Sequence, residues 1–146
     1  MKMLVAADLS ESTAGLLLEA EKMALALSAT VVLLHVAEPE PDFVGLEVGP
    51  DSVRDSLAQA YRSEHRQIQA IAEQWRQSGL EATALLVQGP TAATILSEAM
   101  KLAADMIVVG SHGRGMMQQL LVGSVSKGVL QAAKIPVLVV PTHGRG

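Results

Sequence analysis

Residues 106–126 read MIVVGSHGRGMMQQLLVGSVS, and this stretch decides which fold the chain is expected to adopt. It opens with a short apolar run, Met106–Val109, that ends in a glycine. It closes with Gly123-Ser124, after which Val125 and Val129 follow helical spacing. A buried strand, a glycine-rich connection and a helix, in that order, are typical of an α/β protein.

Four more apolar runs of the same kind occur along the chain. None of them alternates between apolar and polar residues, which is typical of strands that are buried on both faces of a parallel sheet. Their shortness and the turn residues around them argue against pieces of buried helix. The four runs are Met3–Ala7, Val31–Val36, Ala82–Val87 and Pro136–Val140.

Helical patterns fill the intervals between these runs. The clearest begins near Val53 and continues to Trp75, with Asp51 or Ser52 as its expected cap and Gly79 just past its end. Glu64 is the one polar residue in its apolar stripe. The other three helices are expected from roughly Glu11 to Ser28, after Pro90-Thr91 and after Gly123-Ser124.

The alternation of five strands with four helices predicts a single α/β domain over residues 1–146. Right-handed crossovers between parallel strands place helices on both faces of an open sheet. The one long irregular connection, Ala37–Pro50, holds three of the six prolines. It follows the second strand, so it either borders a ligand crevice or is a variable surface loop.

Composition excludes several classes of function. Eleven Lys and Arg against 15 Asp and Glu give a formal charge of −4, and only Phe43, Tyr61 and Trp75 carry aromatic rings. Nucleic-acid partners favour a basic surface and stacking rings, so none is expected. The absence of cysteine excludes disulfides and thiolate metal sites. No apolar run approaches the ~18 residues of a membrane helix. We therefore expect a cytoplasmic protein with no membrane partner.

The segment Gly110–Ser126 has the chemistry of a phosphate-binding loop. Glycines let the backbone approach a ligand closely. A helix that starts near Gly123-Ser124 presents its N–H groups to an anion. The helix dipole contributes only ~0.3–1 kcal/mol, so further donors are expected from Ser124 and Ser126. Arg114 either reaches a phosphate or points into solvent. The sequence therefore predicts binding of a nucleotide such as ATP, whereas the alternative is a connection that binds nothing.

The spacing of this loop matches neither the Walker P-loop nor the dinucleotide motif GxGxxG. It resembles the loop of the universal stress protein family, G-2x-G-9x-G-(S/T), and the match is complete at Gly110, Gly113, Gly123 and Ser124. The resemblance runs from Met3 to Pro141. Three further segments carry it: Asp8-Leu9-Ser10, Leu33-Leu34-His35-Val36 and Pro136–Pro141. One departure is Leu9, where the family frequently has glycine.

The resemblance implies a Rossmann-like sheet of the adenine nucleotide alpha hydrolase type, with strand order 3-2-1-4-5. ATP would lie along the carboxyl edge of the sheet, with Mg²⁺ bound through its phosphates. Asp8 would lie near the ribose or the triphosphate, and the Val36 backbone would meet the adenine edge. A homodimer through the last strand is also implied. The residues that would line the ribose and phosphates are Gly110, Gly113, Gly123, Ser124, Val125 and Ser126.

Individual polar residues have plainer alternatives. Asp8 either contacts the ligand or only holds the turn before the first helix. We expect His35 to be a hydrogen-bonded structural residue, and His112 to be either a phosphate contact or a turn residue. No cluster of His and carboxylates has metal-ligand spacing, so no metal ligand from the protein is predicted.

Three functions remain open from the sequence. The leading one is an ATP-binding, regulatory stress-response protein that acts through its nucleotide-loaded state. The second is a slow ATPase or phosphotransferase, although no general base beyond Asp8 and no Walker lysine is evident, so no catalytic residue is predicted. The third is a protein-interaction module independent of nucleotide. Family members of that kind lack the glycine loop, which this chain keeps.

Overall fold

The computed structural model describes residues 1–10, 13–37, 50–111 and 123–142, without the side chains of 50–55. Strands and helices alternate over these residues as the sequence predicts. No helix among them is long and apolar enough to cross a membrane. The elements are β1 (Lys2–Ala6), α1 (Thr13–Leu27), β2 (Thr30–Ala37), α2 (Pro50–Gln77), β3 (Glu81–Gln88), α3 (Thr91–Lys101), β4 (Met106–Gly110), α4 (Ser124–Ala132) and β5 (Val137–Val140).

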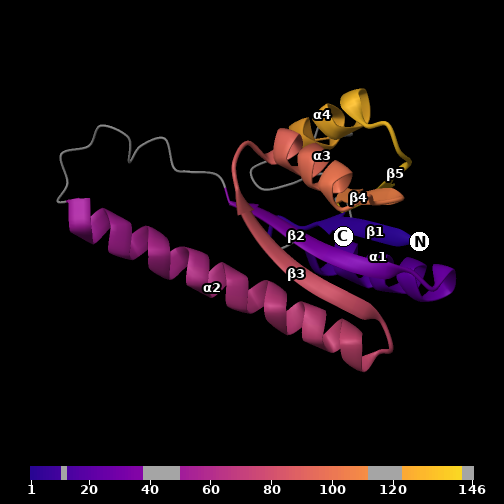
Figure 1. The fold of residues 1–146 in the computed structure, drawn as a ribbon, viewed down its shortest axis with the longest axis horizontal. Coiled ribbons are helices and arrows are strands. Elements are labelled where there is room, and N and C mark those ends of the chain that lie inside the picture. The colour runs from indigo at the N-terminus through magenta and orange to yellow at the C-terminus, as the bar shows by residue number, and fades with distance from the viewer. Residues whose placement is uncertain (11–12, 38–49, 112–122, 143–146) are drawn as a thin grey trace.

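The five strands form one parallel sheet in the order β3-β2-β1-β4-β5, which confirms the expected topology. β1 lies at the centre, where Val5 pairs with Leu33 of β2 and with Val108 of β4. The chain builds outward on one side of β1 through β2 and β3, then continues on the other side through β4 and β5 (Figure 1). The strand order therefore reverses between β1 and β4.

Helices cover both faces of the sheet, and each face has its own core. Met3, Val5 and Leu33 point to the face covered by α1 and α2, where they join Leu16 and Ile68. The alternate residues of the same strands, such as Leu4, Val32 and Ile107, point to the face of α3 and α4, where Ile95 and Val129 are buried. Both faces are apolar, which is why the strand sequences show no alternation.

One predicted helix start is wrong. α2 begins at Pro50, so Asp51 and Ser52 lie in its first turn and do not cap it. Proline suits the first helical position because its fixed φ matches the helix and its missing N–H would have no partner there. The predicted end of α2 is confirmed, since Gly79 lies two residues after Gln77 and has a left-handed φ of 101°.

Three helices end at the amino edge of the sheet with the same backbone pattern. In each, an N–H beyond the helix donates to a carbonyl five residues earlier at 2.9–3.0 Å. This is the Schellman arrangement, which needs a left-handed residue just after the helix. The donors are Ala29, Leu80 and Ala104, and the left-handed residues before them are Ser28, Gly79 and Ala103.

Candidate functional site

A cavity of about 540 Å³ opens at the carboxyl edge of the sheet. It lies where the strand order reverses, which is the usual ligand position in an open α/β sheet. Its volume is within the roughly 300–1,000 Å³ that is common for small-molecule sites. Its wall includes the ends of β1, β2 and β4, the start of α4, and residues of α1, α2 and α3. Among the predicted site residues, the lining contains Asp8, Val36, Gly110, Gly123, Ser124, Val125 and Ser126.

Asp8 follows β1 and lies in the wall of this cavity. Its Oδ1 accepts hydrogen bonds from the Ser10 N–H at 3.0 Å, the Ser10 hydroxyl at 2.7 Å and the Thr13 hydroxyl at 2.8 Å. Thr13 is the first residue of α1, so the carboxylate joins the turn to the start of the helix. Asp8 therefore holds the turn before α1, which is the plainer of its two predicted roles. The same hydrogen bonds hold its carboxylate at the cavity wall.

Leu9 adopts a backbone conformation that favours glycine. Its φ is 60°, a left-handed conformation that costs a residue with a Cβ about 1–2 kcal/mol. The Leu9 side chain packs against the core under α1 and α2, which offsets part of that cost. The turn therefore accommodates Leu9 at a cost in backbone strain.

The Val36 backbone faces the cavity because β2 is longer than β1. The Leu34 carbonyl accepts from Ala7 N–H at 2.9 Å, and the Ala37 carbonyl accepts from Gly89 N–H at 3.2 Å. In a parallel sheet the N–H and C=O of one residue point to the same side, and successive residues alternate. The N–H and C=O of Val36 therefore point to the same side as those of Leu34, toward β1. The pairing of β1 with β2 ends at Ala6. Val36 offers one donor and one acceptor to the cavity.

The two ends of the predicted phosphate loop lie together. The Ser126 hydroxyl donates to the Gly110 carbonyl, and Gly123 N–H donates to the Ser111 carbonyl. These bonds bring the start of α4 against the end of β4. Because the Ser126 hydroxyl hydrogen points to Gly110, Ser126 would meet an anion through its backbone N–H. The predicted residues Gly113 and Arg114, and also His112, lie outside the described residues.

The N-terminus of α4 points its open end toward the cavity. Gly123 precedes the helix in an extended conformation, with φ −72° and ψ 165°, and no side chain caps the helix start. The first N–H groups of a helix have no partner within the helix. Ser124, Val125 and Ser126 are the residues that carry them here, and all three line the cavity. The arrangement can bind an anion.

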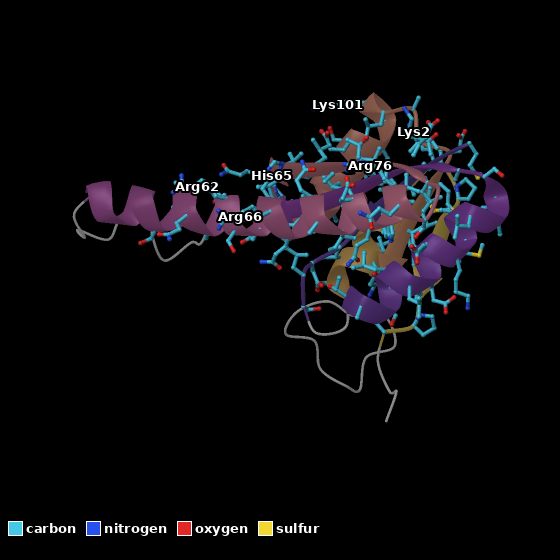
Figure 2. All side chains as sticks on the ribbon, turned by 90° about the horizontal axis from the view of Figure 1, so that it is seen from below. Lys2, Arg62, His65, Arg66, Arg76 and Lys101 are labelled. Atoms are coloured by element: carbon cyan, nitrogen blue, oxygen red, sulfur yellow. The ribbon has the colours of Figure 1, made fainter. Side chains whose placement is uncertain are left out.

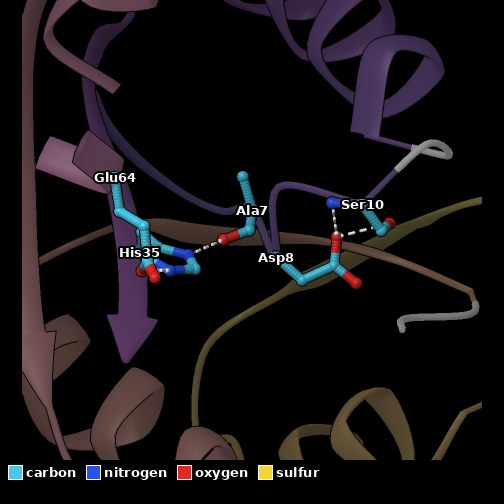
Figure 3. A network of polar contacts seen from close by, with 5 residues as sticks. All are labelled: Ala7, Asp8, Ser10, His35 and Glu64. Carbon is cyan, nitrogen blue, oxygen red and sulfur yellow. Dashed lines mark hydrogen bonds and ion pairs between the residues drawn. The ribbon is translucent and has the colours of Figure 1, made fainter. Parts of the chain in front are cut away.

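His35 is a buried, hydrogen-bonded residue, as predicted. Its Nδ1 lies 2.8 Å from the Ala7 carbonyl oxygen and its Nε2 lies 2.5 Å from Glu64 Oε2 (Figure 3). Glu64 comes from α2, so the pair joins this helix to the end of β2. One feature of the sequence hinted at this contact, namely that Glu64 is a polar residue in an apolar stripe. It did not show which residue Glu64 would meet.

The Lys and Arg side chains of the described residues lie away from the cavity. Arg62, His65 and Arg66 are exposed on α2, and Lys101 is exposed on α3 (Figure 2). Within the described part of the chain, no Lys or Arg lines the cavity and no group of three or more His, Asp or Glu could hold a metal ion. Backbone N–H groups and hydroxyls are therefore the donors that this part of the cavity supplies.

Comparison with known proteins decides the family. The model of the Universal stress protein family matches residues 1–141. The chain belongs to the universal stress protein family. Among its relatives, universal stress protein YxiE of Bacillus subtilis is 31% identical over 144 residues, which span 95% of this chain and 97% of the relative.

Several solved structures share the fold of this chain. Hypothetical protein MJ0577 is 25% identical with a TM-score of 0.81, covering 98% of this chain and 96% of the other. A universal stress protein in complex with cAMP is 21% identical with a TM-score of 0.68, covering 98% of both chains. One from Archaeoglobus fulgidus in complex with dAMP is 20% identical with a TM-score of 0.63, covering 96% and 97%. Some family members therefore bind adenine nucleotides.

Proposed function

We propose that this chain binds ATP in the cavity at the carboxyl edge of the sheet, with Mg²⁺ held through the phosphates. Its nucleotide-loaded state would then serve a regulatory role in the stress response. The observation that carries the proposal is that one cavity contains both the outward-facing Val36 backbone and the N-terminus of α4. The relatives that were solved with cAMP and dAMP support the choice of an adenine nucleotide.

Val36 is suited to the adenine edge. Adenine offers an acceptor at N1 beside a donor at its amino group. The Val36 N–H would donate to N1, and the Val36 carbonyl would accept from the amino group. Guanine has the opposite arrangement, with an N1–H donor beside a carbonyl acceptor. Val36 is therefore expected to select adenine over guanine, because a mismatched edge leaves polar groups without partners.

The start of α4 is suited to the phosphates. Gly110 and Gly123 allow close approach of the backbone, and the first turn of α4 supplies N–H donors. Gly113 and Arg114 would complete the phosphate-binding side of the site. The Asp8 carboxylate would repel a bare triphosphate, so we assign it to a ribose hydroxyl or to the bound Mg²⁺.

We further propose that the nucleotide is held and at most slowly hydrolysed. Asp8 is the one carboxylate that we place near the phosphates, and its Oδ1 already accepts three hydrogen bonds. Fast phosphoryl transfer needs a group that orients the attacking water and cations on the phosphates. Incubation with Mg·ATP should release phosphate no faster than one turnover in many minutes, and rapid turnover would make the protein an ATPase.

β5 supports a proposed homodimer. It is the last strand of the sheet, and its residues Val137, Leu138 and Val139 are partly exposed. An apolar edge strand offers N–H and C=O groups for pairing with a second copy. Sedimentation at increasing concentration should show a dimer that Val139→Lys weakens. A monomer at every concentration would contradict this part of the proposal.

The nucleotide itself is best identified from the purified protein. Mass spectrometry of the small molecules released on denaturation should find ATP or another adenine nucleotide. In competition, GTP should bind at least about tenfold more weakly than ATP because of the reversed base edge. Equal affinities for ATP and GTP would contradict the role assigned to Val36. The absence of any affinity for adenine nucleotides would contradict the proposed function.

A further inference from the structure

The contact between His35 and Glu64 forms part of the wall of the nucleotide cavity. His35 is 5% exposed, and the Glu64 side chain is 29% exposed. The imidazole lies between the Glu64 carboxylate and the Ala7 carbonyl, and Ala7 is the residue before Asp8 (Figure 3). Three elements meet here, because these residues come from β2, α2 and the turn after β1.

The partners of the ring fix where its hydrogens lie. A carbonyl oxygen only accepts, so Nδ1 carries a hydrogen and donates it to Ala7. At 2.5 Å, Nε2 and Glu64 Oε2 must share one proton, since two lone pairs would repel each other. Glu64 thereby fixes the ring in the orientation that keeps Nδ1–H on the Ala7 carbonyl.

Ala7 is held by β2 on both sides of its Cα. Its N–H donates to the Leu34 carbonyl at 2.9 Å, and its C=O accepts from His35 at 2.8 Å. β1 has already ended at Ala6, so these two bonds define the path by which the chain leaves the sheet. The peptide between Ala7 and Asp8 is therefore fixed in orientation, and the Asp8 side chain projects from its far end.

We propose that His35 and Glu64 are positioning residues for nucleotide binding: they hold the Ala7–Asp8 peptide and thus the Asp8 carboxylate at the cavity. Since Glu64 belongs to α2, nucleotide affinity then depends on how this helix lies against the sheet. The inference rests on the proposed function, because it assigns these residues a role in binding the same ligand. Neither side chain has to touch the nucleotide for the effect.

Substitutions separate this role from general destabilisation. His35→Leu removes both contacts and should weaken Mg·ATP binding about tenfold. Glu64→Leu should weaken binding about threefold to tenfold by releasing the ring. His35→Asn should recover most of the affinity, since its amide N–H₂ can take the place of Nδ1–H toward Ala7. Glu73→Leu is the matched control, because Glu73 is an exposed carboxylate on the same helix that pairs with Arg76.

A double-mutant cycle with Asp8 shows whether the effect passes through Asp8. In an Asp8→Ala background, both His35→Leu and Glu64→Leu should cause little further loss of affinity. Full additivity, or affinities of the single variants equal to wild type, would overturn the inference. If His35→Leu does not fold, the cycle is completed with Glu64→Leu, since Glu64 is only partly buried.

The ring itself gives a second readout that does not depend on ligand. Nitrogen-15 spectra of ligand-free protein should show a hydrogen on His35 Nδ1, assigned by its loss in His35→Asn. An Nδ1 without hydrogen would overturn the inference even if ATP binds. A wild-type protein that binds no adenine nucleotide would overturn the proposed function and the inference together. Binding by wild type that His35→Leu and Glu64→Leu leave unchanged would overturn the inference alone.

Discussion

The two edges of the sheet are built differently. At the amino edge, helices return to strands through residues 28–29, 78–80, 102–105 and 133–136, and the first three connections are closed by the same helix-ending hydrogen bond. At the carboxyl edge, strands pass to helices through residues 7–12, 38–49, 89–90 and 111–123. Three of these four connections are longer than any at the amino edge, and the cavity opens at this edge of the sheet. Three of the four helix ends at the amino edge are closed by hydrogen bonds within the turn, whereas the carboxyl edge turns donors and a carboxylate toward a cavity.

This difference predicts which substitutions change the stability of the protein and which change its affinity for the ligand. Substitutions at the amino edge act on the backbone of a closed turn, so they should change the free energy of unfolding and leave ligand affinity alone. Substitutions at the carboxyl edge should act mainly on affinity. The predictions that follow test this separation, beginning with the largest effect.

Gly123→Val should give the largest loss of binding. Gly123 is buried at the cavity wall and precedes α4 in an extended conformation that any residue can adopt. The damage therefore comes from the side chain, which occupies the space where a phosphate would approach the backbone. We expect Mg·ATP affinity to fall by about 100-fold or more. Calorimetry measures the affinity for Mg·ATP, and thermal unfolding of the same variant measures its stability.

Gly123→Ala is the matched control for that variant, since it adds one methyl group and should weaken binding less. Equal affinities of wild type and Gly123→Val would show that phosphates do not approach the start of α4.

Asp8 should show the next largest effect, with two variants that separate its roles. Asp8→Asn keeps an oxygen to accept from Ser10 and Thr13 but loses the charge. It should weaken Mg·ATP binding about tenfold with little loss of stability. Asp8→Ala also removes the hydrogen bonds at Oδ1 and should cost a further ~1–3 kcal/mol of unfolding free energy. Titration of each variant with ATP, with and without Mg²⁺, measures its affinity. Urea unfolding measures its stability, and the two measurements together distinguish the variants.

If Asp8→Asn binds Mg·ATP as tightly as wild type, the charge of Asp8 has no part in the site. The carboxylate would then serve only to brace the start of α1.

Gly79→Ala should affect stability alone. Gly79 has a φ of 101°, and a Cβ added there would meet nothing within 4 Å. The cost therefore comes from the backbone conformation and should be about 1–2 kcal/mol. Urea unfolding measures it, and Mg·ATP affinity should stay within twofold of wild type. A clear loss of affinity would show that the amino edge is coupled to the cavity.

Ala103→Gly should give the smallest effect, with the opposite sign. Ala103 occupies the equivalent position after α3 with a φ of 53° and is exposed. Glycine removes about 1–2 kcal/mol of strain but adds about 0.4–1 kcal/mol of unfolded-chain entropy. The net gain in unfolding free energy should be about 0.5 kcal/mol. Destabilisation by this variant would contradict the strain assigned to the turn.

The sequence predicted the architecture well because its signals are local. Apolar runs without alternation identified strands buried on both faces, and Gly79 identified the end of α2. The strand order came from the family resemblance rather than from any pattern within the chain. The start of α2 at Pro50 was missed, since Asp51 and Ser52 are equally suited to a cap by residue type.

The site was predicted less completely, because its geometry depends on contacts between distant segments. The outward direction of the Val36 backbone follows from where β1 ends relative to β2, which no residue pattern reveals. The contact of His35 with Glu64 joins residues 29 positions apart on different elements. The closure of Ser126 onto Gly110 likewise depends on how α4 meets β4.

The central claim is that the carboxyl edge holds ATP between Val36 and the start of α4. Titration of nucleotide-free protein with Mg·ATP, in parallel with Gly123→Val, tests it most directly. We predict micromolar binding at one site per chain, lost in the variant while its unfolding remains cooperative. Wild-type protein that shows no binding at millimolar Mg·ATP would contradict the account.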